Sequence, residues 1–187
     1  MPMNLWARKF WHLLGTFIPF IYYFSHLSQK SAALIVFCLF LLALIIDGSR
    51  LLLPTFNHWF LTYFGRLCKE EEYTSFTSTI YYLAAITLTI YLFPKKVAVC
   101  ALLYLTVGDP AAAIGGYYIP LKRIWQNKTL GGSLCNFFVC FLLTLLFYHW
   151  LIAIFGATIA VLVELFSPID DALTIPLISA LFLYLLV

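Results

Sequence analysis

The stretch LTVGDPAAAIGGYY, residues 105–118, places Asp109 and Pro110 inside a segment that is otherwise apolar. A carboxylate at membrane depth costs about 2.5–3.5 kcal/mol on insertion scales, so it is expected to face a partner or a wet cavity. Proline has no backbone donor but fits the first turn of a helix, and Gly108 and Asp109 precede it as cap residues would. We therefore predict a membrane helix that breaks and restarts near Asp109. Its free N–H groups would then face a phosphate or an ion held by the carboxylate, and a kink capped locally by Asp109 is the alternative.

The composition of the whole chain agrees with a membrane setting. Of its 187 residues, 64% are hydrophobic and 10% are charged, and the net charge of +3 is too small to indicate nucleic-acid binding. We therefore predict an all-α, polytopic integral membrane protein in which residues 1–187 form a single transmembrane catalytic domain. Oligomeric state is left open.

The apolar segments can be measured against the roughly 20 residues that cross a bilayer as a helix. By this measure the sequence predicts about seven transmembrane helices, at residues 10–25, 32–48, 76–93, 95–118, 133–149, 150–166 and 171–187. The separation of the fifth and sixth helices depends on a single interfacial turn at Tyr148, His149 and Trp150. Residues 51–72 mix apolar and aromatic side chains with a charged end, which predicts an interfacial amphipathic helix.

Basic residues are distributed unequally between the two ends of the predicted helices. One end carries Arg8, Lys9, Arg50, Arg66, Lys69, Lys122, Arg123 and Lys128, whereas the other carries Lys30, Lys95 and Lys96. The positive-inside rule then predicts a cytoplasmic N-terminus. The membrane would be the cell inner membrane, or the endoplasmic reticulum in a eukaryote.

The motif KTLGGS, residues 128–133, follows the fourth predicted helix at the cytoplasmic face. A lysine, two glycines and small hydroxyl side chains at a helix start can cradle an anion through backbone N–H groups. The motif lacks the Walker A spacing, so a flexible basic loop is the alternative.

The motif VELFSPIDDALTIPL, residues 163–177, brings three carboxylates to the same face. Glu164, Asp170 and Asp171 lie around Pro168, and they would repel one another unless a cation or a basic group neutralised them. Carboxylates of this kind suit Mg²⁺ bridged to substrate phosphates. A solvated acidic turn is the alternative.

Two smaller groups complete the cytoplasmic face. Arg8 and His12 share one side of the first helix at i, i+4 spacing, and Asp47 and Arg50 can pair at i, i+3. For Lys9 we favour a snorkelling side chain without a specific partner. The hydroxyl run at residues 73–79 is expected to form hydrogen bonds between helices.

Taken in order, these groups resemble the blocks of a known family. The blocks are Arg8-Lys9 with His12, Asp47 with Arg50, TSTIYYLAA (77–85), VGDPAAAIGG (107–116), NKTLGGSL (127–134) and VELFSPIDDALTIPL (163–177). In this order they resemble the CTP-dependent lipid kinases, a family that includes dolichol kinase, phytol kinase and CTP-dependent diacylglycerol kinase. The resemblance covers nearly the whole chain.

The resemblance implies an enzyme that transfers the terminal phosphate of CTP to the hydroxyl of a membrane lipid, with Mg²⁺ as cofactor. The acceptor would be a lipid alcohol of the polyprenol, diacylglycerol or phytol type. The implied nucleotide-binding residues are Arg8, His12, Gly108, Asp109, Lys128, Thr129, Gly132 and Ser133. The implied metal ligands are Asp109, Glu164, Asp170 and Asp171, and the implied catalytic residues are Asp109, Asp171 and Lys128. Two positions depart from the family pattern: Gly131 stands in place of a glutamate, and Ala172 in place of an asparagine.

Two other functions use similar parts. Phosphatidate cytidylyltransferase, which makes CDP-diacylglycerol, also binds Mg²⁺ and CTP at a membrane, but its His-Gly-Gly and Asp-Arg run is absent from this sequence. A small ion-coupled transporter would use Asp109 in a broken helix to bind a cation. Transport sites lie near the midplane, whereas the polar groups here gather at one face. We therefore rank both below the lipid kinase.

Overall fold

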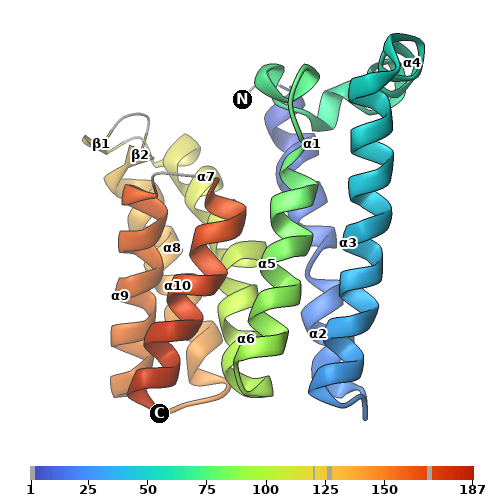
Figure 1. Ribbon diagram of the computed structural model, residues 1–187. Coiled ribbons are helices and arrows are strands. Elements are labelled where there is room, and N and C mark those ends of the chain that lie inside the picture. Colours follow the sequence, from blue (N-terminus) through green and yellow to red (C-terminus); the bar gives the residue numbers. More distant parts are fainter. Residues whose placement is uncertain (1–2, 120, 126–127, 168–169) are drawn as a thin grey trace.

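The computed structural model describes residues 3–119, 121–125, 128–167 and 170–187, and most of them are helical. The helices run roughly along one axis (Figure 1). The elements are α1 (Met3–Leu14), α2 (Phe17–Phe24), α3 (Gln29–Leu52), α4 (Pro54–Phe64), η1 (Gly65–Leu67), η2 (Glu70–Tyr73), α5 (Ser78–Leu92), α6 (Lys95–Leu103), η3 (Tyr104–Gly108), α7 (Asp109–Tyr118), β1 (Arg123–Trp125), β2 (Lys128–Thr129), α8 (Leu130–Leu145), α9 (Trp150–Phe166) and α10 (Asp171–Leu186). Each of the seven predicted segments therefore contains helical structure.

Two helices in the described part of the chain are long and apolar enough to cross a membrane. They are α3 and the continuous helix over Lys95–Tyr118, and α5, α8, α9 and α10 are shorter apolar helices. The predicted turn between the fifth and sixth segments is confirmed, because α8 ends at Leu145 and α9 begins at Trp150. His149 caps α9 by accepting a hydrogen bond from the N–H of Leu151 at 3.3 Å.

The first predicted segment, residues 10–25, is not one helix. It divides into α1 and α2 at Gly15 and Thr16, because Pro19 cannot donate to the carbonyl four residues earlier. That carbonyl, of Gly15, accepts instead from the Tyr82 hydroxyl at 2.8 Å and from the Ile18 N–H at 3.1 Å. Tyr82 thereby fixes the end of α1 against α5.

The predicted break near Asp109 was wrong. Gly108 and Asp109 both have right-handed helical backbone angles, and the chain stays helical from Lys95 to Tyr118. A π-helical turn, η3, lies where the break was expected, and the N–H of Asp109 donates to the carbonyl of Tyr104. The wider turn accommodates Pro110 without interrupting the helix. The peptide groups after Asp109 are consequently used within the helix, and Asp109 is a side-chain site rather than a cap.

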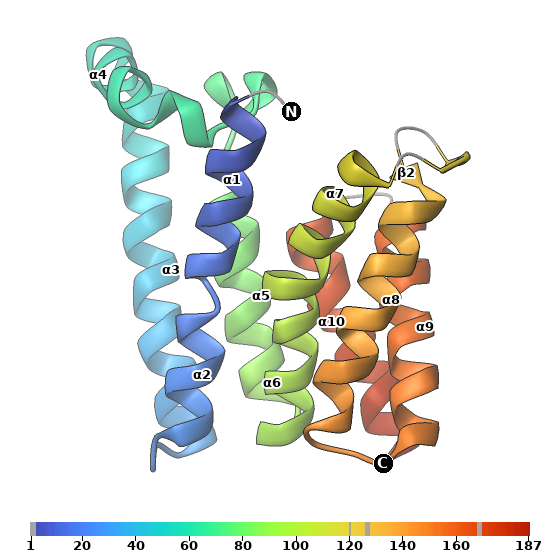
Figure 2. The ribbon, with the colours of Figure 1, turned by 180° about the vertical axis from the view of Figure 1, so that it is seen from behind.

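Helix α6 and its π-helical turn form the centre of the bundle. Residues 97–106 are all buried, and α6 packs against α2, α5, α8 and α10. Figure 2 shows α1, α2 and α3 on one side of this central helix and α8 and α9 on the other. Helices α5 and α10 lie against each other and join the two sides.

The end of the bundle that carries the N-terminus also carries α4 and a small β-hairpin (Figures 1 and 2). Helix α4 lies across this end, as expected for the amphipathic segment, and none of its side chains is buried. The hairpin, in which Arg123 pairs with Thr129 and Trp125 with Lys128, was missed by the all-α prediction. It leads directly into α8, whose first N–H donates to the Lys122 carbonyl at 3.0 Å.

Candidate active site

Asp109 forms an ion pair with the first helix. It is buried, 6% exposed, at the start of α7, and its Oδ2 accepts from Lys9 Nζ at 2.5 Å. Helix α1 packs against both the π-helical turn and α7, which brings two residues 100 positions apart into contact. Lys9 was expected to snorkel without a partner, so its contact with Asp109 corrects that expectation.

Lys128 joins two of the predicted carboxylates. Its Nζ donates to Glu164 Oε1 at 2.5 Å, to the Glu164 carbonyl at 2.9 Å and to Asp171 Oδ2 at 3.1 Å. Burial disfavours the charged form of Lys128, but the carboxylates of Asp171 and Glu164 outweigh burial, so the pKa of Lys128 lies above its ordinary value. Lys128 therefore carries its positive charge throughout the physiological pH range.

These two ion-pair groups line one cavity of about 330 Å³, which we call the Asp109 cavity. Its walls come from α1, α7, β2, the start of α8, the end of α9 and the start of α10. The lining residues are Lys9, Asp109, Ala112, Ala113, Gly116, Tyr117, Lys128, Thr129, Gly132, Ser133, Glu164 and Asp171. The hydroxyl oxygen of Ser133 is buried and has no hydrogen-bond partner in the part of the chain that the structure describes. The cavity thus retains an unused donor beside its charges.

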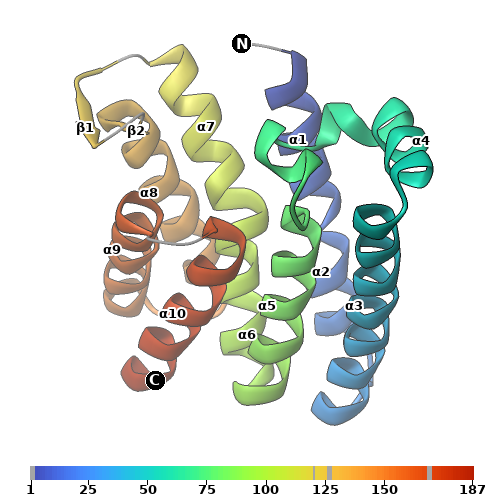
Figure 3. The ribbon, with the colours of Figure 1, turned by 45° about the horizontal axis from the view of Figure 1, so that its top comes forward.

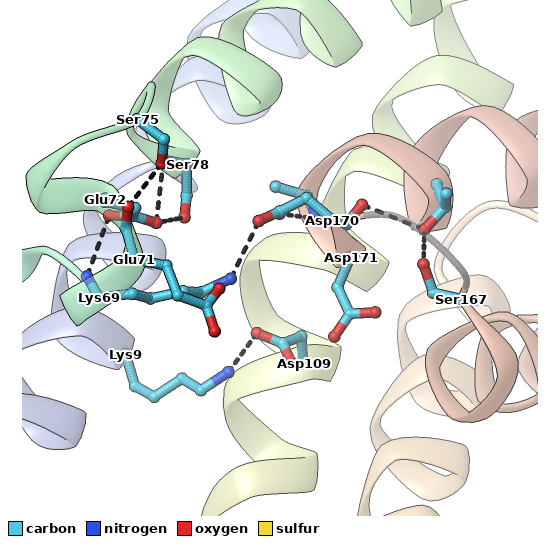
Figure 4. A network of polar contacts seen from close by, with 12 residues as sticks. Lys9, Lys69, Glu71, Glu72, Ser75, Ser78, Asp109, Ser167, Asp170 and Asp171 are labelled. Carbon is cyan, nitrogen blue, oxygen red and sulfur yellow. Dashed lines mark hydrogen bonds and ion pairs between the residues drawn. The ribbon is translucent and has the colours of Figure 1, made fainter. Parts of the chain in front are cut away.

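Figure 4 shows a second ion pair that crosses between the two sides of the bundle, from Lys69 to Asp170. Lys69 Nζ and Asp170 Oδ2 are 3.0 Å apart. Asp170 also caps α10, because its Oδ1 accepts from the N–H of Ala172 at 2.9 Å. Its neighbour Asp171 lies beside Asp109 in the same view. The two adjacent aspartates therefore have different surroundings, and Asp171 alone lines the Asp109 cavity.

The structure brings together seven of the predicted site residues and separates the other four. Asp109, Lys128, Thr129, Gly132, Ser133, Glu164 and Asp171 line the Asp109 cavity. Arg8 and His12 line a different cavity, Asp170 lines a third with Lys69, and Gly108 packs against Asn136 and Cys140 of α8. Lys9, for which a snorkelling side chain was favoured, also lines this cavity, and its neighbour Arg8 lies on another face of the same helix.

The two glycines of the KTLGGS motif have a packing role. A Cβ on Gly131 would overlap the carbonyl oxygen of Ile119, and a Cβ on Gly132 would lie 2.6 Å from the carbonyl oxygen of Ala112. The start of α8 therefore makes backbone contact with α7, which only glycine permits. The same contact explains why this chain cannot hold a glutamate at position 131 on this backbone.

The four predicted metal ligands do not form one cluster. Among the described residues, no group of three or more His, Cys, Asp and Glu side chains is placed to hold a metal ion. Lysines contact each of the four carboxylates instead. The carboxylates still fit the usual coordination of Mg²⁺ in nucleotide sites, because this ion commonly binds one or two carboxylates together with substrate phosphates rather than an all-protein cage. The carboxylates of Asp109 and Asp171 face one cavity and provide that number.

The predicted pair of Asp47 and Arg50 is confirmed, and it belongs to a separate buried group that we call the Arg50 cluster: Asp47, Arg50, Asn57 and Thr77. Arg50 Nε donates to Asp47 Oδ1 at 2.6 Å, and its remaining nitrogens donate to Asn57 Oδ1 and to the carbonyls of Glu72 and Ser75. Asp47 Oδ2 accepts from the N–H and hydroxyl of Thr77, at 2.7 and 2.9 Å. This cluster fixes the loop between α4 and α5.

Asn127 and Pro168, which belong to the quoted motifs, lie outside the described residues.

The fold and the Asp109 cavity together define a helical, strongly apolar protein with a pocket in which two lysines lie among three carboxylates. The chain is 27% identical to CTP-dependent diacylglycerol kinase 1 of Saccharomyces cerevisiae over 207 residues, which cover 94% of this chain and 71% of that protein. It is 26% identical to the protein of the same name from Eremothecium gossypii over 211 residues, covering 96% and 66%. The Schizosaccharomyces pombe protein of that name is 30% identical over 164 residues, covering 75% and 74%.

The chain therefore belongs to the CTP-dependent lipid kinase family. It spans between 66% and 74% of the length of these relatives. No family model matches the chain, and no solved structure matches it.

Proposed function

We propose that this protein transfers the terminal phosphate of CTP to the hydroxyl of a membrane lipid alcohol, with diacylglycerol as the acceptor. The observation that carries the proposal is the Asp109 cavity. Two lysines and three carboxylates from distant parts of the chain line it, together with the buried Ser133 hydroxyl, which has no partner among the described residues. The names of the three relatives support CTP as donor and diacylglycerol as acceptor.

The reaction is proposed to occur at the cytoplasmic face of a membrane that all seven helical segments cross. Large apolar side chains on the outside of α3 support this setting, since Leu34 is 61% exposed and Ile45 is 65% exposed. The exposed aromatic side chains Trp59 and Tyr63 of α4 suit the interface between lipid and water. The Asp109 cavity lies at the end where the basic residues gather, which the positive-inside rule assigns to the cytoplasm.

Lys9 and Lys128 are proposed to hold the phosphates of CTP. Each lysine already lines the cavity with its ammonium group paired to a carboxylate, so phosphate oxygens can replace the carboxylate oxygens as acceptors. The Ser133 hydroxyl and Thr129 would contact the same phosphates. Asp109, with Asp171, would hold the Mg²⁺ of the nucleotide, which when bound neutralises charge on the phosphates.

Asp171 is proposed to orient the lipid hydroxyl and accept its proton. Its side chain is 35% exposed, whereas that of Glu164 is 4% exposed and that of Asp109 is 8% exposed. An incoming acceptor therefore meets Asp171 most easily. The hydroxyl oxygen bonds to the γ-phosphorus, the bond from that phosphorus to the β–γ bridging oxygen breaks, and CDP leaves.

The proposal is tested with purified protein in detergent, offered CTP labelled separately at the α and γ phosphates. Diacylglycerol, a polyprenol, phytol and phosphatidate serve as acceptors, and lipid and nucleotide products are identified. We expect the γ label on diacylglycerol and release of CDP. Transfer of the α label to phosphatidate with release of diphosphate would instead show a cytidylyltransferase. Ion flux in vesicles without any product from CTP would show a transporter.

A further inference from the structure

A second cavity, of about 230 Å³, lies between α1, α3, α4 with η1, and α5 at the same end of the molecule. Figure 3 shows these elements grouped beside α7. Most of its lining is apolar or aromatic and includes Trp11, Ala43, Ile46, Phe60, Phe64 and Tyr82. A pocket with this lining suits a hydrocarbon group rather than a nucleotide.

Helix α1 separates the second cavity from the Asp109 cavity. Lys9 lines the Asp109 cavity, whereas Arg8 and His12 line the second cavity. Because successive residues of a helix are rotated by about 100°, adjacent positions face different sides. His12 follows Lys9 by three positions, so the two side chains lie on adjoining parts of the surface of α1. A ligand at His12 therefore lies next to the part of α1 that lines the Asp109 cavity.

The polar groups of the second cavity differ in whether they have hydrogen-bond or ion-pair partners. Asp47 is bonded to Arg50 and Thr77, and Glu72 accepts from the backbone N–H groups of Lys69 and Ser78. In contrast, His12 Nδ1 is buried without a hydrogen-bond partner, and Arg8 forms no ion pair or hydrogen bond within the described part of the chain. A buried polar atom without a partner is costly. The side of the cavity formed by α1 is thus the side that can bind the polar part of a ligand.

We infer that the second cavity binds the acceptor, a diacylglycerol, with its glycerol esters at Arg8 and His12 and its first acyl carbons among the aromatic side chains. The inference rests on the proposed function. It places diacylglycerol and CTP in two cavities that lie on either side of α1. Arg8 donates to ester carbonyl oxygens, which are present in diacylglycerol and absent from polyprenol and phytol. Arg8 and His12 are accordingly residues of the lipid site, not of the nucleotide site that the family resemblance implied.

The test fills the second cavity without touching the Asp109 cavity. Ala43→Phe places a ring in the cavity from α3, and Leu42→Phe adds the same group one position away, where the side chain is 55% exposed. Activity is measured in mixed micelles with CTP and diacylglycerol varied independently. We expect Ala43→Phe to raise the KM for diacylglycerol at least tenfold with the KM for CTP unchanged, and Leu42→Phe to change neither. An unchanged KM for diacylglycerol, or a raised KM for CTP, overturns the inference.

A second variant tests the lipid site if Ala43→Phe does not fold. A direct binding measurement tests the same site without depending on phosphate transfer. Arg8→Gln is expected to raise the KM for diacylglycerol at least threefold more than the KM for a long-chain alcohol without esters. In the binding measurement, diacylglycerol with a photoreactive group near the glycerol is crosslinked to the wild-type protein without CTP. Crosslinks in α1, α3 or α4 support the lipid site even if no phosphate is transferred, and crosslinks confined to α8 and α9 contradict it.

Discussion

The Arg50 cluster and the lining of the Asp109 cavity both place charged side chains in an apolar bundle. Only in the Arg50 cluster are the charged groups fully buried and bonded to one another. In the Arg50 cluster, a side chain with no exposed surface bonds to Asp47, Asn57 and two backbone carbonyls, and the guanidinium lies 5.0 Å from the centre of the Phe60 ring. In the Asp109 cavity, Lys9 has one carboxylate partner and Ser133 has none among the described residues. Charge alone therefore does not distinguish the two groups, whereas unused bonding capacity beside open volume does.

The largest effect is expected when the closed group is broken. Arg50→Met leaves Asp47 buried without its cation, and breaking a buried pair in this way costs about 3–5 kcal/mol. We expect a large loss of unfolding free energy in denaturant titrations in micelles, and loss of folded protein on size-exclusion chromatography. Arg66→Met is the control, because Arg66 is exposed. Equal stability of the two variants would show that the Arg50 cluster does not hold the loop.

The open group is expected to respond in activity rather than in folding. Asp109→Asn keeps the size of the side chain but removes the charge that faces Lys9, and we expect kcat/KM for CTP to fall about 100-fold or more, as when one electrostatic group of an active site is removed. The melting temperature should change less than for Arg50→Met. Glu70→Gln, at an exposed position, is the matched control. An Asp109→Asn enzyme with wild-type kinetics would remove the cavity from the mechanism.

The pairing of Lys128 predicts a pH dependence of stability. Because the pKa of Lys128 is raised in the folded protein, its contribution is complete below the unfolded-state pKa of about 10.4 and is lost as pH rises through the higher folded-state pKa. The difference in melting temperature between the wild type and Lys128→Gln should be constant from pH 7 to about pH 10 and shrink above that. Lys122→Gln, at an exposed position, should show no such difference. A difference that already declines near pH 8 would contradict the pairing.

The smallest effect is expected for the pair of Lys69 and Asp170. The Lys69 side chain is 36% exposed and that of Asp170 is 16% exposed, so the pair should contribute at most about 1 kcal/mol. A double-mutant cycle of Lys69→Gln and Asp170→Asn, measured by denaturation, gives the coupling directly. A coupling above about 2 kcal/mol would mean that this pair belongs with the Arg50 cluster.

Helix positions and the gathering of charge at one end could be predicted from the sequence, because both follow from residue composition along the chain. The turn at His149 and the pair of Asp47 and Arg50 were also local features. Asp109, Lys128, Glu164 and Asp171 were predicted to meet, and they line one cavity. Charged side chains within a membrane bundle face its interior or a water-filled cavity, so the few that this chain has were expected to lie in a common site.

The remaining errors come from choices that depend on packing. A proline after an aspartate can end a helix or be accommodated by a π-helical turn, and the local sequence is the same in both cases. Arg8 and Lys9 differ by one helical position, so their separate cavities follow from where α7 packs against α1. Two glycines at a helix start can cradle an anion or allow a close helix contact. The positions of Ile119 and Ala112 show the close contact, while Gly132 also lines the Asp109 cavity, so the anion-binding role stays a prediction.

The close contact between α7 and α8 has a consequence for how the Asp109 cavity adapts to its contents. The backbone at Gly131 and Gly132 lies against the carbonyls of Ile119 and Ala112. The side of the cavity that carries Thr129 and Ser133 is therefore closely packed. Helix α1, in contrast, ends at Leu14, ahead of the interruption at Gly15 and Thr16, and it reaches across the cavity through the ion pair of Lys9 with Asp109. Adjustment of the Asp109 cavity to its contents is therefore expected on the side of Lys9 and α1, rather than at the contact between α7 and α8.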